Sequence, residues 1–142
     1  MKILIKYFNP KIPKIEKIEK GDWIDLRAAK PIKLIPGRHV LIPLGVAMQL
    51  PSGYEAHIVP RSSSFKKWGF IQANSVGIID ESYCGDNDEW MLSVYATREA
   101  EINEGDRVCQ FRIVEKQPEI NFEEVIELNN KDRGGFGSTG IK

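Results

Sequence analysis

The sequence predicts an all-β domain built as a sandwich or a barrel. Its apolar and β-branched residues fall into short runs of about four to eight residues, the usual length of a strand. None of these runs shows the long 3.6-residue periodicity of an amphipathic helix. Prolines and glycines also interrupt residues 30–60 repeatedly, and many short strands separated by turns are typical of sandwiches and barrels.

The expected strands follow one another along most of the chain. In order they are Ile3–Phe8, Trp23–Leu26, Val40–Leu44, Val46–Leu50, Tyr54–Val59, Val76–Ile79, Met91–Ala96, Arg107–Val114 and Phe122–Leu128. Pro51-Ser52-Gly53 is a turn sequence and predicts a hairpin between its flanking strands. Helix is expected only as one short turn near Ser62–Lys67. We therefore predict a β-barrel domain over residues 1–129 and a flexible C-terminal arm over 130–142, where apolar periodicity is lacking.

Composition and charge restrict the class of protein. The 142 residues are 42% hydrophobic and 28% charged, with 20 basic and 20 acidic residues and a formal net charge of zero. This length suffices for one domain with a buried core, and the neutral balance argues against a nucleic-acid binder. The apolar N-terminus is too short for a signal peptide or a membrane helix. We therefore expect no membrane partner. Two cysteines make no disulfide framework, so we expect reduced thiols and a cytoplasmic location.

Three segments in the first two thirds of the chain carry candidate chemistry. Asp25 lies inside an apolar run, where a carboxylate is costly unless it is paired or placed at a strand end. The segment Pro60-Arg61-Ser62-Ser63-Ser64 combines a guanidinium with hydroxyls at a turn, which suits an oxyanion. In the segment from Asn74 to Gly85, two glycines bracket an apolar run that ends in Asp80. We expect a tight hairpin there, whose backbone approaches a planar base, with Asp80 as a general base.

Two further segments lie closer to the C-terminus. Gln110 offers an amide that can donate to a phosphate without adding charge. Four of the 12 glycines fall in the last nine residues, together with Phe136, and Arg133 directly precedes them. Such a segment can wrap a phosphate chain and stack a ring on a base. Taken alone, the tail is also compatible with simple disorder, and the Gln110 segment is also compatible with a plain strand. The aromatic Phe136 within the tail argues against a pure linker.

Taken together, the five segments resemble the ordered motifs of the trimeric dUTPase (deoxyuridine triphosphate nucleotidohydrolase) family. The resemblance runs from about residue 21 to residue 140. Its most specific parts are Gly77-Ile78-Ile79-Asp80 with Tyr83 and Gly85, and the tail Arg133-Gly134-Gly135-Phe136-Gly137-Ser138-Thr139-Gly140. It implies a jelly-roll-like distorted β-barrel and a homotrimer in which each active site is assembled from three chains.

The resemblance also implies roles for individual residues. Asp80 is expected to activate water, and Tyr83 to pack beneath the deoxyribose. Asn74 and the hairpin backbone, including Gly77 and Ile79, are expected to read uracil. The expected phosphate contacts are Arg61, Ser62, Ser63 and Gln110, and the expected arm contacts are Arg133, Phe136, Gly137, Ser138 and Thr139.

The implied reaction is attack of water on the α-phosphorus of dUTP, which yields dUMP and pyrophosphate. This activity keeps uracil out of DNA and supplies dUMP for thymidylate synthesis. Mg²⁺ is expected as the cofactor, held mainly by phosphate oxygens and water rather than directly by protein ligands. Asp25 is expected to support the water shell of the metal. Catalysis would then be positioning and electrostatic stabilisation.

Two alternatives remain open from the sequence. A dCTP deaminase shares the fold and an Arg-Ser-Ser segment, although it does not require the glycine-rich tail. A regulatory protein-binding role on a dUTPase body would use the acidic loop Asp86-Asn87-Asp88-Glu89 as its docking surface.

The sequence departs from the family pattern in the first motif. Asp22-Trp23 stands where small residues usually precede the aspartate of that motif.

Overall fold

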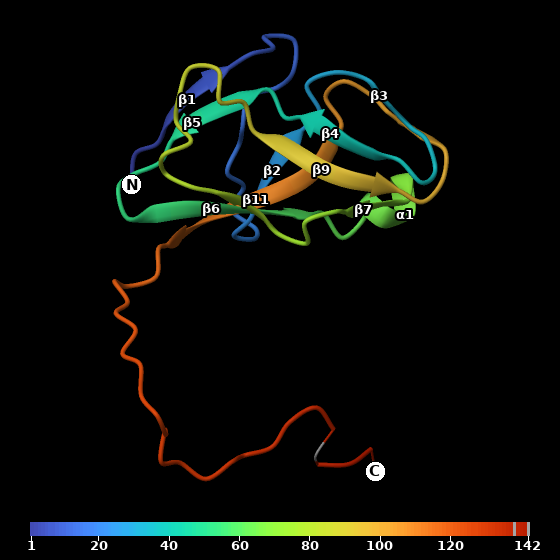
Figure 1. Ribbon diagram of the computed structural model, residues 1–142. Coiled ribbons are helices and arrows are strands. Elements are labelled where there is room, and N and C mark those ends of the chain that lie inside the picture. Colours follow the sequence, from blue (N-terminus) through green and yellow to red (C-terminus); the bar gives the residue numbers. More distant parts are fainter. Residues whose placement is uncertain (138, 142) are drawn as a thin grey trace.

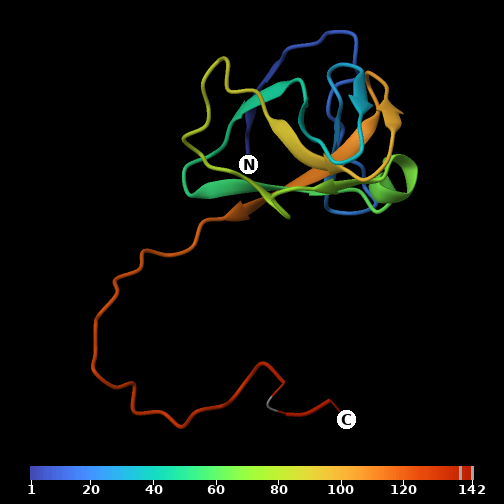
Figure 2. The same cartoon turned by 45° about the vertical axis from the view of Figure 1, so that its right-hand side comes forward.

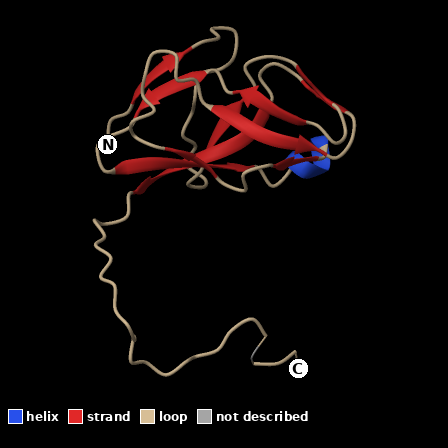
Figure 3. Cartoon of the chain, in the orientation of Figure 1, coloured by secondary structure: helices blue, strands red, loops and turns tan. Residues whose placement is uncertain are grey.

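The computed structural model describes residues 1–137 and 139–141, and its regular elements are strands apart from one short helix (Figure 3). The all-β prediction is confirmed. The elements in chain order are β1 Leu4–Tyr7, β2 Ile24–Arg27, β3 Ile32–Leu34, β4 His39–Pro43, β5 Val46–Gln49, β6 Tyr54–Pro60, α1 Ser64–Trp68, β7 Phe70–Gln72, β8 Gly77–Ile79, β9 Met91–Ala96, β10 Ala100–Ile102 and β11 Arg107–Glu115. α1 lies where a helical turn was predicted, two residues later than expected at its start.

The strands pair in four antiparallel sheets. The largest has the order β2-β11-β6-β8, the next has the order β4-β9-β7, and the pairs β1-β5 and β10-β3 complete the set. Figures 1 and 2 show β6 and β11 on one side of the domain and β5 and β9 on the other. The long strand β11 pairs with both β2 and β6, so it holds these two strands in one sheet.

The core lies between these sheets and is made of apolar side chains from most strands. Trp90 and Phe111 are both buried, and their rings meet edge to face at 5.3 Å. This contact joins the residue just before β9 to the middle of β11, and such a pair adds roughly 0.5–1.5 kcal/mol beyond area burial. Cys109 is also buried, and desolvation raises the pKa of its thiol well above the usual range.

Two expectations about strand pairing were wrong. The turn at Pro51-Ser52-Gly53 forms, with the Tyr54 amide donating to the Pro51 carbonyl at 3.2 Å. However, β5 pairs with β1 and β6 pairs with β11 and β8, so this turn links two sheets instead of closing a hairpin. Residues 122–128 form no strand in the described structure, and Phe122 is 95% exposed.

The chain leaves the domain after β11. Every described residue from Gln117 onward is exposed, and Figure 1 shows this segment extending away from the sheets. The regular elements thus end at Glu115. The division of the chain at residue 129 into a barrel and an arm stays a prediction.

Candidate active site

One end of the large sheet gathers the predicted phosphate ligands. Asp25 on β2 lies opposite Gln110 on β11, and Gln110 in turn lies opposite Val59 on β6. Arg61, which follows β6, brings its Nε to 3.1 Å from Asp25 Oδ1. Arg107 Nη1 lies 3.5 Å from the other carboxylate oxygen. Asp25 therefore avoids the free-energy cost of burying an unpaired carboxylate, because it is partly exposed and has two guanidinium partners. Of these two arginines, the sequence predicted only Arg61 as a site residue.

A buried hydroxyl fixes the turn that carries Arg61. Ser64 is fully buried, and its Oγ accepts from the Arg61 amide at 3.1 Å and donates to the Val108 carbonyl at 3.0 Å. Ser62 and Ser63 stay exposed at the start of α1. The serines therefore divide into one that holds the turn and two whose hydroxyls are accessible to an anion.

Gln110 is held beside this turn. Its Nε2 donates to the Pro60 carbonyl at 3.2 Å, so the amide is directed toward the residue that precedes Arg61. The structure thus brings Asp25, Arg61 and Gln110 together, with both exposed serines on the adjoining turn.

The segment from Asn74 to Gly85 does not form the expected hairpin. β8 pairs with β6, while β7 pairs with β9, so the strands that flank Asn74 belong to two sheets. A tight turn over residues 72–76 connects them, with Ser75 at a φ of 61°. Gly77 is buried, and a Cβ there would lie 3.3 Å from Gln72 Nε2. The close approach of Gln72 therefore explains why residue 77 is a glycine, without reference to a ligand.

Asp80 lies at the end of β8 in a cluster with Glu81 and Lys116. Lys116 Nζ is 2.9 Å from Asp80 Oδ1 and 2.9 Å from Glu81 Oε1. The amide of Ser82 donates to Asp80 Oδ2 at 2.8 Å. The hydrogen bond from Lys116, followed by those from Ser82, holds the pKa of Asp80 well below its usual value. Asp80 is therefore ionised throughout the neutral range, as a base must be.

The aromatic and the acidic loop that follow Asp80 are tied to the domain. The Tyr83 hydroxyl donates to the Glu89 carbonyl at 3.0 Å, and the Glu89 carboxylate accepts from the Gly45 amide at 2.9 Å. Lys6 Nζ donates to the Asp86 carbonyl at 2.8 Å. The loop is thus fastened from within this chain, and a docking role for it stays a prediction.

The two polar clusters lie at opposite ends of the same strands. Ile79, next to Asp80, pairs with Ala56 on β6. Continued by one residue, this antiparallel register places Asp80 opposite Glu55, six positions before Arg61, which corresponds to about 20 Å at the strand rise. A single chain therefore does not bring Asp80 and Arg61 to one phosphate group.

The tail residues lie away from both clusters. Arg133, Phe136, Gly137 and Thr139 are exposed, and Figure 2 shows their segment separated from the sheets. Ser138 lies outside the described residues. None of the described tail residues is brought to Asp80 or Arg61 within one chain.

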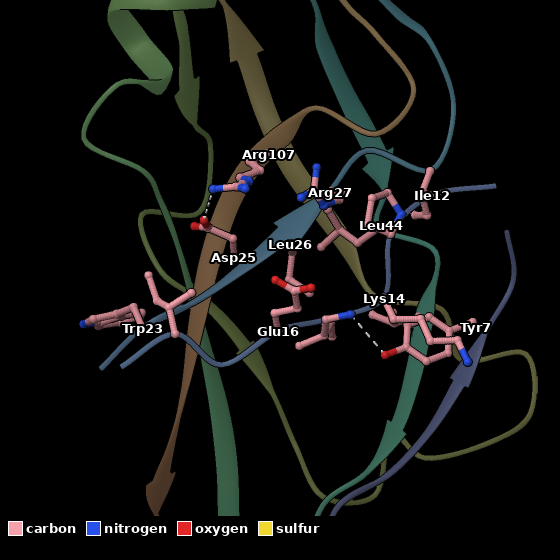
Figure 4. Close-up of a pocket in the computed structure, with 14 residues that line it drawn as sticks. Tyr7, Ile12, Lys14, Glu16, Trp23, Asp25, Leu26, Arg27, Leu44 and Arg107 are labelled. Atoms are coloured by element: carbon pink, nitrogen blue, oxygen red, sulfur yellow. Dashed lines mark hydrogen bonds and ion pairs between the residues drawn. The ribbon is translucent and has the colours of Figure 1, made fainter. Parts of the chain in front are cut away.

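One small pocket lies beside the cluster of predicted phosphate ligands. The N-terminal residues 12–16 and 18 line it together with Trp23, Asp25 and Arg107, as Figure 4 shows for most of them. Its volume of about 50 Å³ is too small for a nucleotide. Among the described residues, no group of three or more His, Cys, Asp or Glu side chains is arranged to hold a metal ion.

Comparison with known proteins decides the family. The dUTPase family model matches residues 12–140, a range that contains all five predicted segments. The chain belongs to the dUTPase family. It is 56% identical over the full length of both chains to the SPbeta prophage-derived deoxyuridine 5′-triphosphate nucleotidohydrolase of Bacillus subtilis. The predicted family is therefore confirmed, and the deaminase alternative is set aside.

Solved structures of dUTPases share the fold of this family member. A dUTPase mutant of Staphylococcus bacteriophage 80alpha with dUpNHpp covers 99% of each chain, with a TM-score of 0.80 and 20% identity. A mutant dUTPase from phage phi11 of S. aureus, described with a structural Mg(II) ion, covers 92% of this chain and all of its own, with a TM-score of 0.76 and 18% identity. Within the described residues, no helix has the length and apolar character needed to cross a membrane.

Proposed function

We propose that this dUTPase hydrolyses dUTP to dUMP and pyrophosphate. The observation that carries the proposal is the family match over residues 12–140, which includes Asp80 and every other predicted site residue from Asp25 to Thr139. The structure adds an ionised carboxylate at the end of β8 and a guanidinium, an amide and two accessible hydroxyls at the end of β6. This activity would keep uracil out of DNA and supply dUMP for thymidylate synthesis.

The proposed mechanism assigns positioning to most of these groups. Asp80 orients and deprotonates the water that attacks the α-phosphorus, which general bases do most effectively from hydrogen-bonding distance. Arg61, Ser62, Ser63 and Gln110 hold the phosphates, because charge-assisted hydrogen bonds to oxyanions are strong. Asn74 and the backbone at Gly77 and Ile79 contact the uracil, and Tyr83 packs beneath the sugar.

We infer that the complete site requires several copies of the chain, in line with the predicted homotrimer. The separation of about 20 Å between Asp80 and Arg61 along β6 is too large for both to act on one α-phosphate. A neighbouring copy can supply the phosphate-binding end. A third copy would supply the exposed tail, where Phe136 covers the base and Arg133, Gly137, Ser138 and Thr139 close on the substrate.

Mg²⁺ fits this arrangement as a group held by the substrate. Asp25 is already paired with two arginines, so its carboxylate is better suited to accept hydrogen bonds from metal-bound water than to ligate the ion directly. When bound, the ion would neutralise phosphate charge and favour departure of pyrophosphate. The phi11 phage dUTPase, described with a structural Mg(II) ion, is consistent with metal use in the family.

A cytoplasmic location is part of the same proposal. Cys84 is exposed and Cys109 is buried, and both are free thiols. Free thiols are usual where the environment is reducing.

A substrate panel tests the proposed activity. The purified chain is incubated with dUTP, dCTP, dTTP or UTP in the presence of Mg²⁺, and pyrophosphate, ammonia and nucleotide products are measured. We expect pyrophosphate and dUMP from dUTP alone at high efficiency. Asp80→Asn should lower turnover by about 10²–10⁴, whereas Glu104→Gln, at an exposed carboxylate that is not a predicted site residue, should not. Ammonia from dCTP, or full activity of Asp80→Asn, would contradict the proposal.

A further inference from the structure

A buried glutamine lies directly behind the side chain proposed to read uracil. Gln72 ends β7 and is only 6% exposed. Its Nε2 donates to the Ile58 carbonyl of β6 at 3.0 Å and to Asn74 Oδ1 at 3.1 Å. The absence of a side chain at Gly77 leaves room for this nitrogen. Gln72 therefore bridges a backbone atom of the large sheet and an exposed side chain on the turn.

The backbone atom fixes the direction of both hydrogen bonds. The carbonyl of Ile58 can only accept, so the atom of Gln72 that faces it must be the amide nitrogen. The second hydrogen of that nitrogen requires an acceptor, which is the side-chain oxygen of Asn74. Asn74 consequently keeps its oxygen toward Gln72 and has its own NH₂ group free to donate elsewhere. Without Gln72, either end of the Asn74 amide could face a ligand.

The main chain of the same turn is also held in place. The Ser75 amide donates to the Gln72 carbonyl at 3.3 Å, and the Val76 amide donates to the Asn74 carbonyl at 2.6 Å. Ser75 adopts a left-handed φ of 61°, which a non-glycine residue adopts mainly where the surroundings require it. Asn74 is therefore fixed in both its backbone and its side chain before any ligand binds.

We propose that Gln72 is a positioning residue that sets the base specificity of the enzyme by keeping the NH₂ group of Asn74 as an outward donor. The inference rests on the proposed function, in which Asn74 contacts the base. We place this donor against the 4-oxo group of uracil, because the 2-oxo group is common to uracil and cytosine and would not distinguish them. Cytosine carries an amino group where uracil carries its 4-oxo group, so two donors would meet and both would lose their partners. Gln72 itself does not touch the base.

Replacing Gln72 by methionine tests this role. Gln72→Met keeps the approximate size of the side chain and removes both N–H donors. We measure kcat and KM for dUTP, and the inhibition constant of dCTP as a competitor. We expect the preference for dUTP over dCTP to fall about tenfold, mainly through a higher KM for dUTP. Gln49→Met, at an exposed glutamine on β5, is the matched control and should leave the preference unchanged.

The preference separates a specific role from general damage. Loss of structure would weaken both nucleotides together and leave their ratio unchanged. A folded Gln72→Met enzyme with the wild-type preference would overturn the inference. Wild-type enzyme that fails to hydrolyse dUTP would instead refute the proposed function.

A measurement on the wild-type protein covers the case in which Gln72→Met does not fold. In ¹⁵N-labelled protein, the side-chain NH₂ of Gln72 should exchange with solvent much more slowly than that of Gln49. Addition of dUMP should then shift the NH₂ signals of Asn74. Rapid exchange at Gln72, or unshifted Asn74 signals with bound dUMP, would overturn the inference.

Discussion

Complementation between two inactive variants tests whether the site is shared between chains. Asp80→Asn removes the candidate base, and Arg61→Ala removes a phosphate ligand at the other end of β6. The strand register separates the two positions by about 20 Å, so each active site should take them from different chains. Both residues are partly exposed, and the ion pair of Arg61 with Asp25 contributes at most about 1 kcal/mol. Both variants should therefore fold.

The expected recovery follows from random assembly. In a cyclic trimer, each site needs an intact Asp80 from one chain and an intact Arg61 from its neighbour. The two variants are mixed in equal amounts and exchange subunits freely. The chain that supplies Asp80 to a site then carries it intact in about half of the cases, and the neighbour that supplies Arg61 does so in about half. About one quarter of the sites are therefore intact. Activity should then rise from the background of either variant to about one quarter of the wild-type rate.

The assay is pyrophosphate release after subunit exchange, with exchange verified by native mass spectrometry of differently labelled chains. The matched control mixes Asp80→Asn with the double variant Asp80→Asn/Arg61→Ala. This mixture contains no intact Asp80 and should show no recovery. Failure of the first mixture to recover, despite verified exchange, would refute the geometric reasoning and place both residues in one intrachain site.

Three further predictions follow from individual contacts. Ser64→Ala leaves the Arg61 amide and a buried carbonyl without their partner, and should lower the free energy of unfolding by about 1–3 kcal/mol in denaturant titrations; an unchanged midpoint would contradict this. Lys116→Met should raise the pKa of Asp80 toward its ordinary value of 3.8, because the lysine is the main cause of its depression. The stabilisation from the pair of Lys116 and Asp80 is present at neutral pH and is lost as the pH falls below that value. A ¹³C titration of the Asp80 carboxyl measures its pKa in both proteins, and an unchanged pKa in Lys116→Met would contradict this cause. Deleting residues 131–142 should leave Tm nearly unchanged, since the strands end at Glu115, and should lower kcat/KM at least tenfold; a fall in Tm or retained activity would count against it.

The sequence predicted the elements that have a clear local signal. The runs that became β4, β5, β6, β9 and β11 are long enough, and apolar enough, to be recognised. The strands β3, β7 and β10 have only three residues each, too few to show any periodicity. Residues 122–128 carry the same composition as a strand but pair with no strand among the described residues. Pairing depends on distant segments, and composition alone does not specify it.

The same distinction applies to the site. Asp25, Arg61 and Gln110 were chosen from separate segments, and the structure brings them together. Gln72 and Lys116 were missed because each is a single polar residue in or next to a strand, with no local motif. Their importance comes from contacts between elements far apart in the sequence. The pairing of β6 with β8 and β11 creates those contacts, and the sequence of one segment does not show which distant strand it pairs with.

The position of Lys116 bears on how the tail can move. Its amide donates to the Gly53 carbonyl at 2.9 Å, and its Nζ contacts both Asp80 and Glu81. Lys116 is thus anchored by main chain and side chain together, while every described residue after it is exposed. Segments with few buried contacts are the ones that move at low cost in free energy. The hinge that the proposed closure of the tail requires therefore belongs at Gln117 or beyond, where movement leaves the candidate base in place.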